Sequence, residues 1–379
     1  MKKKTIGKEY IFTALILFVV LAVTMVLDSQ LPSYHIVIKV IKKASVYSLV
    51  AVSMNLLNGF TGLFSLGQAG FMLLGAYSYA VLCIPVAKRA GVYQYFDGGI
   101  VKFSLPEIFA SFLGDKVGSA VGMILALLVG GLIAAFFAYL IGLPVLRLKS
   151  DYLAIATLGF AEIMRTIIQW NAIGPLTNAS NLLKGYPDFS SATAYLLLIG
   201  VFIACVVLLV NSTYGRAFKA IRDDEIAAGA SGLNTTYLKV LVFAISAFFA
   251  GIAGGIFAQY IGSLNPTMAG WLNSINYVIM VVFGGMGSLT GSIVSAIGLT
   301  ILPELLRAFA DYRMLAYSVV LVLVMIFRPQ GIFGSWEFSL PRLVNRMLFR
   351  GAAGKGAKPA ASAKQHDQSD DKTVKEASR

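Results

Sequence analysis

Charged side chains are scarce in this chain of 379 residues. Only 13% of them are Asp, Glu, Lys or Arg, whereas a soluble domain carries about 25%, so an ordinary soluble globular domain is excluded. Hydrophobic residues make up 58% of the chain, and the mean hydropathy is +0.77. Apolar runs of about 20 residues recur, which matches a hydrocarbon core about 30 Å thick. These runs are continuous rather than alternating, as expected of membrane helices, and they predict an all-α, polytopic helical membrane protein.

Histidine and cysteine are almost missing. The two histidines, His35 and His366, belong to no metal motif, and no serine has the glycine flanks of a nucleophile. Cys83 and Cys205 lie inside apolar runs, where they act as small core residues rather than as a disulfide or metal ligands. The GAAGKGAK stretch near the C-terminus has the wrong spacing for a phosphate-binding loop. We therefore expect no catalytic residue, no metal and no cofactor in this chain.

The net charge of +13 is read as a signal of membrane orientation. No basic face interleaved with aromatic side chains lies outside the apolar runs, so a nucleic-acid partner is not expected. With the N-terminus inside, most of the 31 Lys and Arg residues fall on the cytoplasmic side, as the positive-inside rule requires. The sequence thus predicts a chain embedded in a lipid bilayer with both termini in the cytoplasm.

The apolar runs predict ten spans, at residues 10–27, 44–58, 67–84, 117–141, 152–170, 192–210, 240–261, 273–285, 289–306 and 312–328. The first is expected to be an uncleaved helix, because no small-residue cleavage site follows it. Residues 1–350 then form a transmembrane domain with an external loop at about 85–116. Residues 351–379 are almost free of apolar side chains and predict a disordered cytoplasmic tail.

Two glycine-rich segments interrupt the apolar runs, NGFTGLFSLGQAG at Asn58–Gly70 and FGGMGSLTGS at Phe283–Ser292. The first has too little length for two full spans and an aqueous loop, so we expect it within membrane depth. Non-helical backbone there is buried in protein or lines a cavity, and broken helices are typical of transporter binding sites. Close helix packing through small residues is the alternative. The candidate residues for a translocation pathway are Gly62, Ser65, Gly67, Gln68, Gly285 and Gly287.

Glu162 and Arg165 are a further candidate pair, inside the span at 152–170. Residues three apart face the same side of a helix, and ionisable groups in a bilayer are costly and usually paired. The pair either locks its helix to the neighbouring helices or contributes to a polar translocation path. The sequence leaves both interpretations open.

One compact polar stretch of mixed charge, STYGRAFKAIRDDEIAAGASGLNTTYLK at 212–239, separates two long apolar parts of the chain. We call it the island. Asp223 or Asp224 can cap the start of a helix there, and Gly232 is placed to end that helix about two turns later. Such a helix on the cytoplasmic side suits contact with a soluble partner, although an ordinary amphipathic surface helix has the same pattern.

Five motifs in this order resemble one known family: NLLNGFTGLFSLGQAGFMLLGAYSYA, LPVLRLKSDYLAIATLGFAEIMR, the island, VVFGGMGSLTGSIVSAIGLTILPELLR and MIFRPQGIFG. The resemblance, over about 55–334, is to the LivM-type permease subunits of bacterial branched-chain amino-acid ABC importers. It implies a multi-pass protein of the bacterial cell membrane, with a second, LivH-like permease, two cytoplasmic subunits that bind ATP, and an extracytoplasmic substrate-binding protein. It also implies that the island is the coupling helix for the ATPase, through Arg222, Asp223, Asp224, Glu225 and Gly232.

Some positions depart from the pattern of that family. The chain has GPLTNASN at Gly174–Asn181 in place of a Gly-Gly-Pro-Asn type segment, and Gln68 stands where a histidine is expected. These departures bear on the substrate, because permeases for urea or short amides are closely similar. An ion-coupled secondary transporter is the alternative from another class, and Glu162 is the clear intramembrane acid that it could use. A channel is disfavoured, because no ring of filter residues is evident.

Overall fold

The computed structural model describes residues 21–32, 35–148, 150–307, 312–328, 331–332 and 334. These residues belong to one compact unit, Leu17–Phe338. The predicted tail at 351–379 lies outside the described residues, as does the first half of the predicted span at 10–27. Residues 21–30 at the end of that span are helical.

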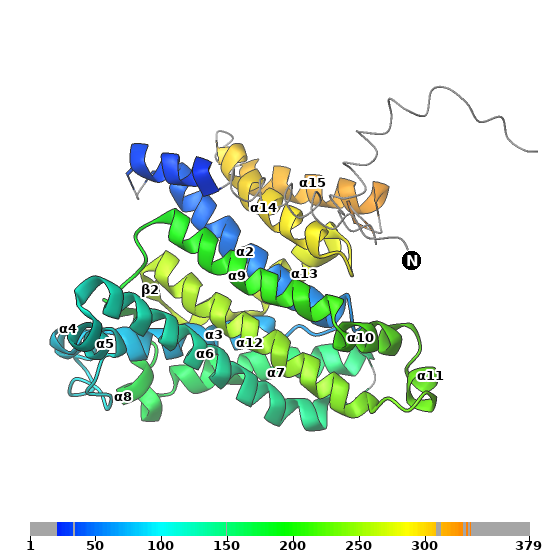
Figure 1. Ribbon diagram of the computed structural model, residues 1–379, viewed down its shortest axis with the longest axis horizontal. Helices are drawn as coiled ribbons and strands as arrows, with labels where there is room; N and C mark the ends of the chain where they lie inside the picture. Colours follow the sequence, from blue (N-terminus) through cyan, green and yellow to red (C-terminus); the bar gives the residue numbers. More distant parts are fainter. Residues whose placement is uncertain are drawn as a thin grey trace, which may run out of the picture. The chain divides into compact units, whose positions relative to one another are not determined.

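The described chain is almost entirely helical (Figure 1). In chain order its helices are α2 (Ile36–Asn58), α3 (Gln68–Cys83), α4 (Val86–Val92), α5 (Leu105–Leu113), α6 (Asp115–Val145), α7 (Ser150–Gln169), η1 (Asn171–Ile173), α8 (Gly174–Thr177), α9 (Ala192–Asn211), α10 (Thr213–Asp223), α11 (Glu225–Ala230), α12 (Thr235–Ile261), η2 (Pro266–Ala269), α13 (Trp271–Gly284), α14 (Leu289–Leu305) and α15 (Arg313–Phe327). Two short strands, β1 (Leu183–Lys184) and β2 (Ser263–Leu264), pair antiparallel. The all-α prediction is confirmed.

The helix boundaries follow the predicted apolar runs within a few residues, with one exception. Helix α2 begins at Ile36 rather than at residue 44, so the predicted start is wrong. Lys42 lies inside this helix and is only 7% exposed. Its ammonium donates a hydrogen bond to the Ser190 carbonyl at 2.7 Å and lies 4.9 Å from the centre of the Tyr195 ring. The helix continues through Lys39, Lys42 and Lys43, because contacts with distant residues satisfy the buried ammonium of Lys42.

Three of the described helices, α6, α9 and α12, are each long and apolar enough to cross a membrane. Helices α3 and α4 also pass this test together, but a bend of 120° separates them, while α13 and α14 are shorter apolar helices. The chain is therefore an integral membrane protein with several apolar helices, some of them broken.

Helix α12 is the central element of the bundle and packs against α2, α3 and α6 (Figure 1). Of its most apolar 18-residue stretch, 78% is buried, compared with 33% for the same stretch of α6 and 22% for that of α9. Glycines permit this packing: a Cβ on Gly254 would lie 1.9 Å from the Met72 carbonyl oxygen, and one on Gly75 would lie 1.9 Å from that of Gly251. Small residues let membrane helices approach closely and gain van der Waals contact. The exposed faces of α6 and α9 are left for lipid or a partner.

The segment at 85–116 is built around one buried cation. Arg89, in α4, is 3% exposed and donates hydrogen bonds to the carbonyl oxygens of Val81, Val101 and Phe103 at 2.9, 2.7 and 2.6 Å. A buried guanidinium needs such acceptors, because an unpaired buried charge is costly. Arg89 thus joins the end of α3 to the loop before α5, and the segment predicted as a loop at 85–116 contains the short helices α4 and α5.

The strand pair fixes a second loop against the end of α12. Leu183 pairs with Leu264 and Lys184 with Ser263, and the Tyr186 hydroxyl donates to the Ala258 carbonyl at 3.1 Å. The loop that leads to α9 is therefore tied to the C-terminal end of α12.

Candidate functional site

The island contains two short helices, α10 and α11, and the first turn of α12, where the sequence predicted one helix. Helix α11 begins at the predicted cap: Asp224 Oδ1 accepts hydrogen bonds from the backbone N–H groups of Ile226 and Ala227 at 2.8 and 3.0 Å, as an N-cap does. Gly232 follows the end of α11 with φ of +88°, a conformation that glycine adopts at little cost. The cap and the end of this helix agree with the prediction.

Helix α10 precedes α11 and was not predicted. Its buried residues are Gly215, Phe218 and Ile221, which recur at the spacing of one helix face. In the sequence this spacing is hard to recognise, because Lys and Arg residues stand between the apolar residues of α10. The island therefore presents 11 residues of amphipathic helix before the predicted one begins.

Two basic side chains of α10 contact the first glycine-rich segment. Arg222 Nη1 donates a hydrogen bond to the Gly59 carbonyl oxygen at 3.2 Å, and Lys219 Nζ lies 5.3 Å from the centre of the buried Phe60 ring. Arg222 also holds Asp223, with Nη2 2.9 Å from Oδ1. The island is thus bonded directly to the break between α2 and α3.

The first break, residues 59–67, is non-helical and relies on two different glycine properties. Gly62 has φ of +73°, and a Cβ on it would lie 2.9 Å from Arg222 Cγ. Gly67 has an ordinary negative φ, but a Cβ there would lie 2.9 Å from the Thr157 carbonyl oxygen of α7. Gly62 is therefore needed for the turn, and Gly67 for the close approach of the break to α7.

The polar side chains of the first break are buried and paired. Ser65 is 1% exposed, and its hydroxyl accepts a hydrogen bond from the Gly67 N–H at 3.3 Å. The backbone N–H and carbonyl of Ser65 bond to the Asn58 amide at 3.2 and 3.4 Å. Gln68, also 1% exposed, donates to the hydroxyls of Ser53 and Ser246, each at 3.1 Å. In the described chain these two predicted pathway residues hold α2, α3 and α12 together around the break.

The second break, between α13 and α14, is fastened to α2 by Asn55. The Asn55 carboxamide oxygen accepts a hydrogen bond from the Gly287 N–H at 2.9 Å. Its nitrogen donates to the Ser288 carbonyl at 2.9 Å and to the Ser292 hydroxyl at 2.8 Å. Asn55 is fully buried, so these bonds satisfy an amide that would otherwise be costly.

The two breaks and Arg222 meet at one place. Gly287 has φ of +88°, and a Cβ on it would lie 3.1 Å from Arg222 Nη1 and 3.5 Å from the Gly59 carbonyl oxygen. Gly285 has φ of +107°, and a Cβ on it would lie 2.3 Å from the Gly334 carbonyl oxygen. The guanidinium therefore lies where both glycine turns leave room for it.

Glu162 and Arg165 form the predicted ion pair, with Arg165 Nε 2.7 Å from Glu162 Oε2. The other oxygen of Glu162 accepts a hydrogen bond from the Trp271 N–H at 3.2 Å. Trp271 is the first residue of α13, where a carboxylate is favoured by the helix dipole. The pair thus connects α7 to the start of α13, as the locking interpretation requires.

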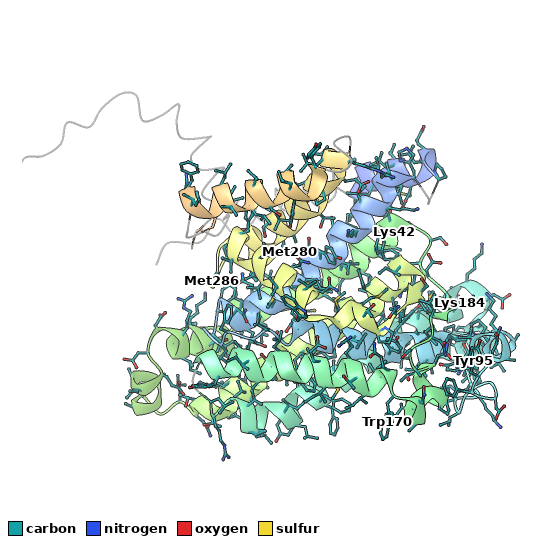
Figure 2. All side chains as sticks on the ribbon, turned by 180° about the vertical axis from the view of Figure 1, so that it is seen from behind. Lys42, Tyr95, Trp170, Lys184, Met280 and Met286 are labelled. Carbon is teal, nitrogen blue, oxygen red and sulfur yellow. The ribbon has the colours of Figure 1, made fainter. Side chains whose placement is uncertain are left out.

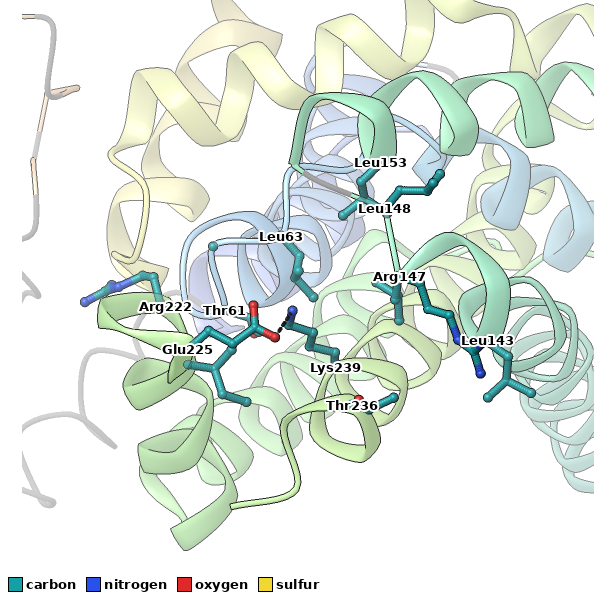
Figure 3. A pocket seen from close by; sticks show the side chains of 13 residues that line it. Thr61, Leu63, Leu143, Arg147, Leu148, Leu153, Arg222, Glu225, Thr236 and Lys239 are labelled. Atoms are coloured by element: carbon teal, nitrogen blue, oxygen red, sulfur yellow. Dashed lines mark ion pairs between the residues drawn. The ribbon is translucent and has the colours of Figure 1, made fainter. Parts of the chain in front are cut away.

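A cavity of about 520 Å³ lies beside the island, as Figure 3 shows. Its wall combines the first break, the end of α6 and the island. Three cationic side chains line it, Arg147, Arg222 and Lys239, with Glu225 as the acidic group. Lys239 Nζ and Glu225 Oε1 form an ion pair at 2.5 Å. The cavity borders on Gly62 and presents more positive than negative charge.

The structure therefore brings together much of what the sequence singled out: Arg222, Asp223, Gly62, Gly285 and Gly287 lie around one junction. Asn55 was missed as a site residue. The signal was an amide in an apolar run, which must find a hydrogen-bond partner in the protein. Among the described residues, no group of His, Cys, Asp and Glu could hold a metal ion.

The fold and this junction define an integral membrane protein with broken helices tied to a charged surface element. The chain belongs to the family described as the permease component of the branched-chain amino acid transport system, which matches residues 36–328. This is a family of transport permeases rather than of enzymes. No solved structure matches the chain.

Several characterised proteins are similar to it. LivM, the high-affinity branched-chain amino acid transport system permease of Escherichia coli K12, is 31% identical over 345 residues, covering 82% of this chain and 71% of LivM. LivM of Salmonella typhimurium is 32% identical over 321 residues, 76% of this chain and 67% of that protein. LivH of E. coli, a permease of the same transport system, is 24% identical over 77% of this chain and 92% of LivH.

Proposed function

We propose that this chain is a permease subunit of an ATP-binding-cassette importer for branched-chain amino acids. Its family and the names of its relatives support the class and the substrate. The observation that carries the mechanism is the position of Arg222, which bonds the island to the first break and adjoins the second. The chain carries out no chemical reaction; it forms part of a route through the membrane.

The proposed assembly follows from that role. A second, LivH-like permease completes the route, an extracytoplasmic protein delivers the substrate, and two cytoplasmic subunits bind and hydrolyse ATP. The chain crosses the inner membrane about ten times, with both termini and the island in the cytoplasm. Most of the basic residues then lie inside, which supports this orientation.

The island is the proposed contact with the ATPase. The coupling residues are Arg222, Asp223, Asp224, Glu225 and Gly232. Asp223 and Glu225 are 69% and 50% exposed as side chains, so they are available to a partner. Arg222 connects this contact surface to the first break, because its guanidinium donates a hydrogen bond to the Gly59 carbonyl. A force applied to α10 or α11 therefore reaches the first break through Arg222, beside the contact of Lys219 with Phe60.

The breaks are the proposed moving parts of the route. Broken helices supply the binding sites and gates of many transporters, and packed elements switch between discrete arrangements rather than deform continuously. Gly62 borders the cavity beside the island. The other proposed pathway residues are Ser65, Gly67, Gln68, Glu162, Arg165, Gly285 and Gly287, and their buried contacts support a role in positioning the two breaks.

The test is ATP-dependent uptake of L-leucine into proteoliposomes that contain the complete importer, with Arg222→Met beside wild type. We expect wild type to accumulate leucine only with ATP, and Arg222→Met to lose most uptake while the complex still assembles. Arg216→Met is the matched control, since Arg216 is on the same helix and, within the part of the chain that the structure describes, its side chain bonds only to Thr213, at 3.3 Å. It should transport normally.

Three results would contradict the proposal in different ways. Uptake by this chain alone, driven by an ion gradient, would make it a secondary transporter. Uptake of urea or acetamide but not of leucine would change the substrate. Full uptake by an assembled Arg222→Met importer would remove the coupling role of this residue and leave the substrate unaffected.

A further inference from the structure

A second cavity, of about 540 Å³, lies far from the island, and the described chain leaves polar groups unpaired in its wall. We propose that it is a recognition site in the permease for a free zwitterionic amino acid. The residues that line it are Lys39, Lys42, Asp188, Tyr195, Gln259, Tyr260 and Ile261. The inference rests on the proposed function. The volume of the cavity is in the range of small-molecule sites, roughly 300–1,000 Å³.

Two buried polar atoms in this wall have no hydrogen-bond partner among the described residues. They are the hydroxyl of Tyr195, a residue with no exposed surface, and Nε2 of Gln259, which is 3% exposed. The other end of the Gln259 amide accepts a hydrogen bond from the Phe189 N–H at 3.4 Å, which fixes the direction of Nε2. Buried polar groups are almost always paired, so a ligand with acceptor oxygens is the expected partner.

The charges of the wall match the two ends of an amino acid. Lys42 has three N–H donors, of which two go to the carbonyl oxygens of Ser190 and Phe189 at 2.7 and 3.4 Å, so the third is available for a carboxylate. Asp188 is exposed and lies within electrostatic reach of Lys42. Its carboxylate is available for the ligand ammonium, while Ile261 and Tyr260 supply apolar surface for a hydrophobic side chain.

The site is rigidly supported on each of its sides. Tyr195 and Lys42 hold one another through the cation–π contact at 4.9 Å. The start of α9, which carries Tyr195, is capped by Asp28, whose oxygens accept hydrogen bonds from the Ala192 and Thr193 N–H groups at 3.1 and 2.8 Å. Pre-organised polar groups bind a ligand with little ordering cost, as a recognition site requires.

The place of the cavity agrees with substrate delivery. Helix α12 starts inside the island, at Thr235, and ends beside the cavity, at Ile261. At a rise of about 1.5 Å per residue its 27 residues separate the two by about 40 Å. Lys42 and Lys184 lie toward the same side of the bundle in Figure 2, away from Met286 of the second break. With the island in the cytoplasm, the cavity faces the side on which a binding protein releases its ligand.

The test is equilibrium binding of radiolabelled L-leucine to the purified complex of permease and ATP-binding subunits, without the substrate-binding protein, in nanodiscs without phosphatidylethanolamine. The competitors are L-leucinamide, which lacks the carboxylate, and 4-methylpentanoate, which lacks the ammonium. We expect Lys42→Met to weaken leucine binding about tenfold or more and to abolish the preference for leucine over leucinamide. Asp188→Asn should weaken leucine binding and abolish the preference for leucine over 4-methylpentanoate, because Asp188 is the proposed partner of the ligand ammonium. A purely structural defect would leave these two preferences unchanged.

The matched control is Lys43→Met. Lys43 is the neighbour of Lys42 in α2 but lies over the Tyr47 ring, 5.6 Å from its centre, and lines a different cavity, so leucine binding should not change. Asp188 is exposed, so Asp188→Asn tests the site even where Lys42→Met assembles poorly.

Unchanged leucine affinity in both site variants of an importer that transports leucine would overturn this inference alone. Displacement of leucine by added phosphatidylethanolamine, which also carries an ammonium and an anionic group, would overturn it in favour of a lipid-headgroup site. A wild-type complex that transports no amino acid would instead contradict the proposed function.

Discussion

Asn55 is the residue on which the contact between the two breaks depends. Its carboxamide makes three hydrogen bonds, to Gly287, Ser288 and Ser292 at the second break and the start of α14. Its backbone carbonyl accepts hydrogen bonds from the N–H groups of Gly59 and Phe60 in the first break, at 2.8 and 3.0 Å. Asn55 thus supplies hydrogen-bond partners to backbone groups of both breaks. The conformations of the two breaks are therefore energetically linked.

Replacing Asn55 by leucine should destabilise the folded permease. The variant keeps similar volume but leaves the Gly287 N–H, which donates to Asn55 Oδ1 at 2.9 Å, without that partner, and an unsatisfied buried group costs about 1–3 kcal/mol. We expect a lower thermal unfolding midpoint of the purified permease pair. Asn211→Leu is the control, since Asn211 is exposed and, among the described residues, its side chain bonds only to Val207 in its own helix. Equal midpoints for the two variants would contradict the role of Asn55.

At the scale of elements, the two breaks are short turns of non-helical backbone enclosed by helices. Gly62, Gly285 and Gly287 all have positive φ, which most side chains adopt only with strain. These turns pack against Arg222 and Gly334. The glycines permit the close packing that the second interpretation expects, and that packing connects the breaks to the island. The role of these segments in a translocation pathway stays a prediction.

Valine at Gly62 or Gly67 should impair uptake more than valine at Gly200. At Gly62 the new side chain is strained by φ of +73° and displaces Arg222, and at Gly67 it meets the Thr157 carbonyl. Gly200 has open space where the Cβ would be, so the cost there is small. The measurement is ATP-dependent leucine uptake, normalised to membrane abundance and complex assembly. Equal uptake by the three assembled variants would show that the breaks tolerate change and do not transmit motion.

For the whole molecule, the sequence predicted the local features and missed the distant contacts. Hydropathy located the long helices, because burial in lipid demands continuous apolar runs, and the capping chemistry of Asp224 located α11. The start of α2 and the role of Asn55 depend on partners 148 and 232 residues away. Such contacts follow from the packing of helices, which the order of residues in one segment does not reveal.

The proposed orientation of the molecule predicts which surfaces a reagent can reach. Ser231 lies in the island and Tyr95 in the loop between α4 and α5, where it is 77% exposed. Cysteines are introduced at each position in a Cys205→Ala background, because Cys205 is the exposed native thiol while Cys83 is buried.

A membrane-impermeant maleimide applied to intact spheroplasts should label Tyr95→Cys and should label Ser231→Cys only after permeabilisation. The reason is electrostatic: with the island inside, most basic residues avoid translocation, as the positive-inside rule requires. Leucine uptake by each variant is the control for correct insertion. Labelling of Ser231→Cys in intact spheroplasts, with Tyr95→Cys protected, would reverse the topology. It would place the island out of reach of a cytoplasmic ATPase, and the amino-acid cavity on the side from which substrate leaves.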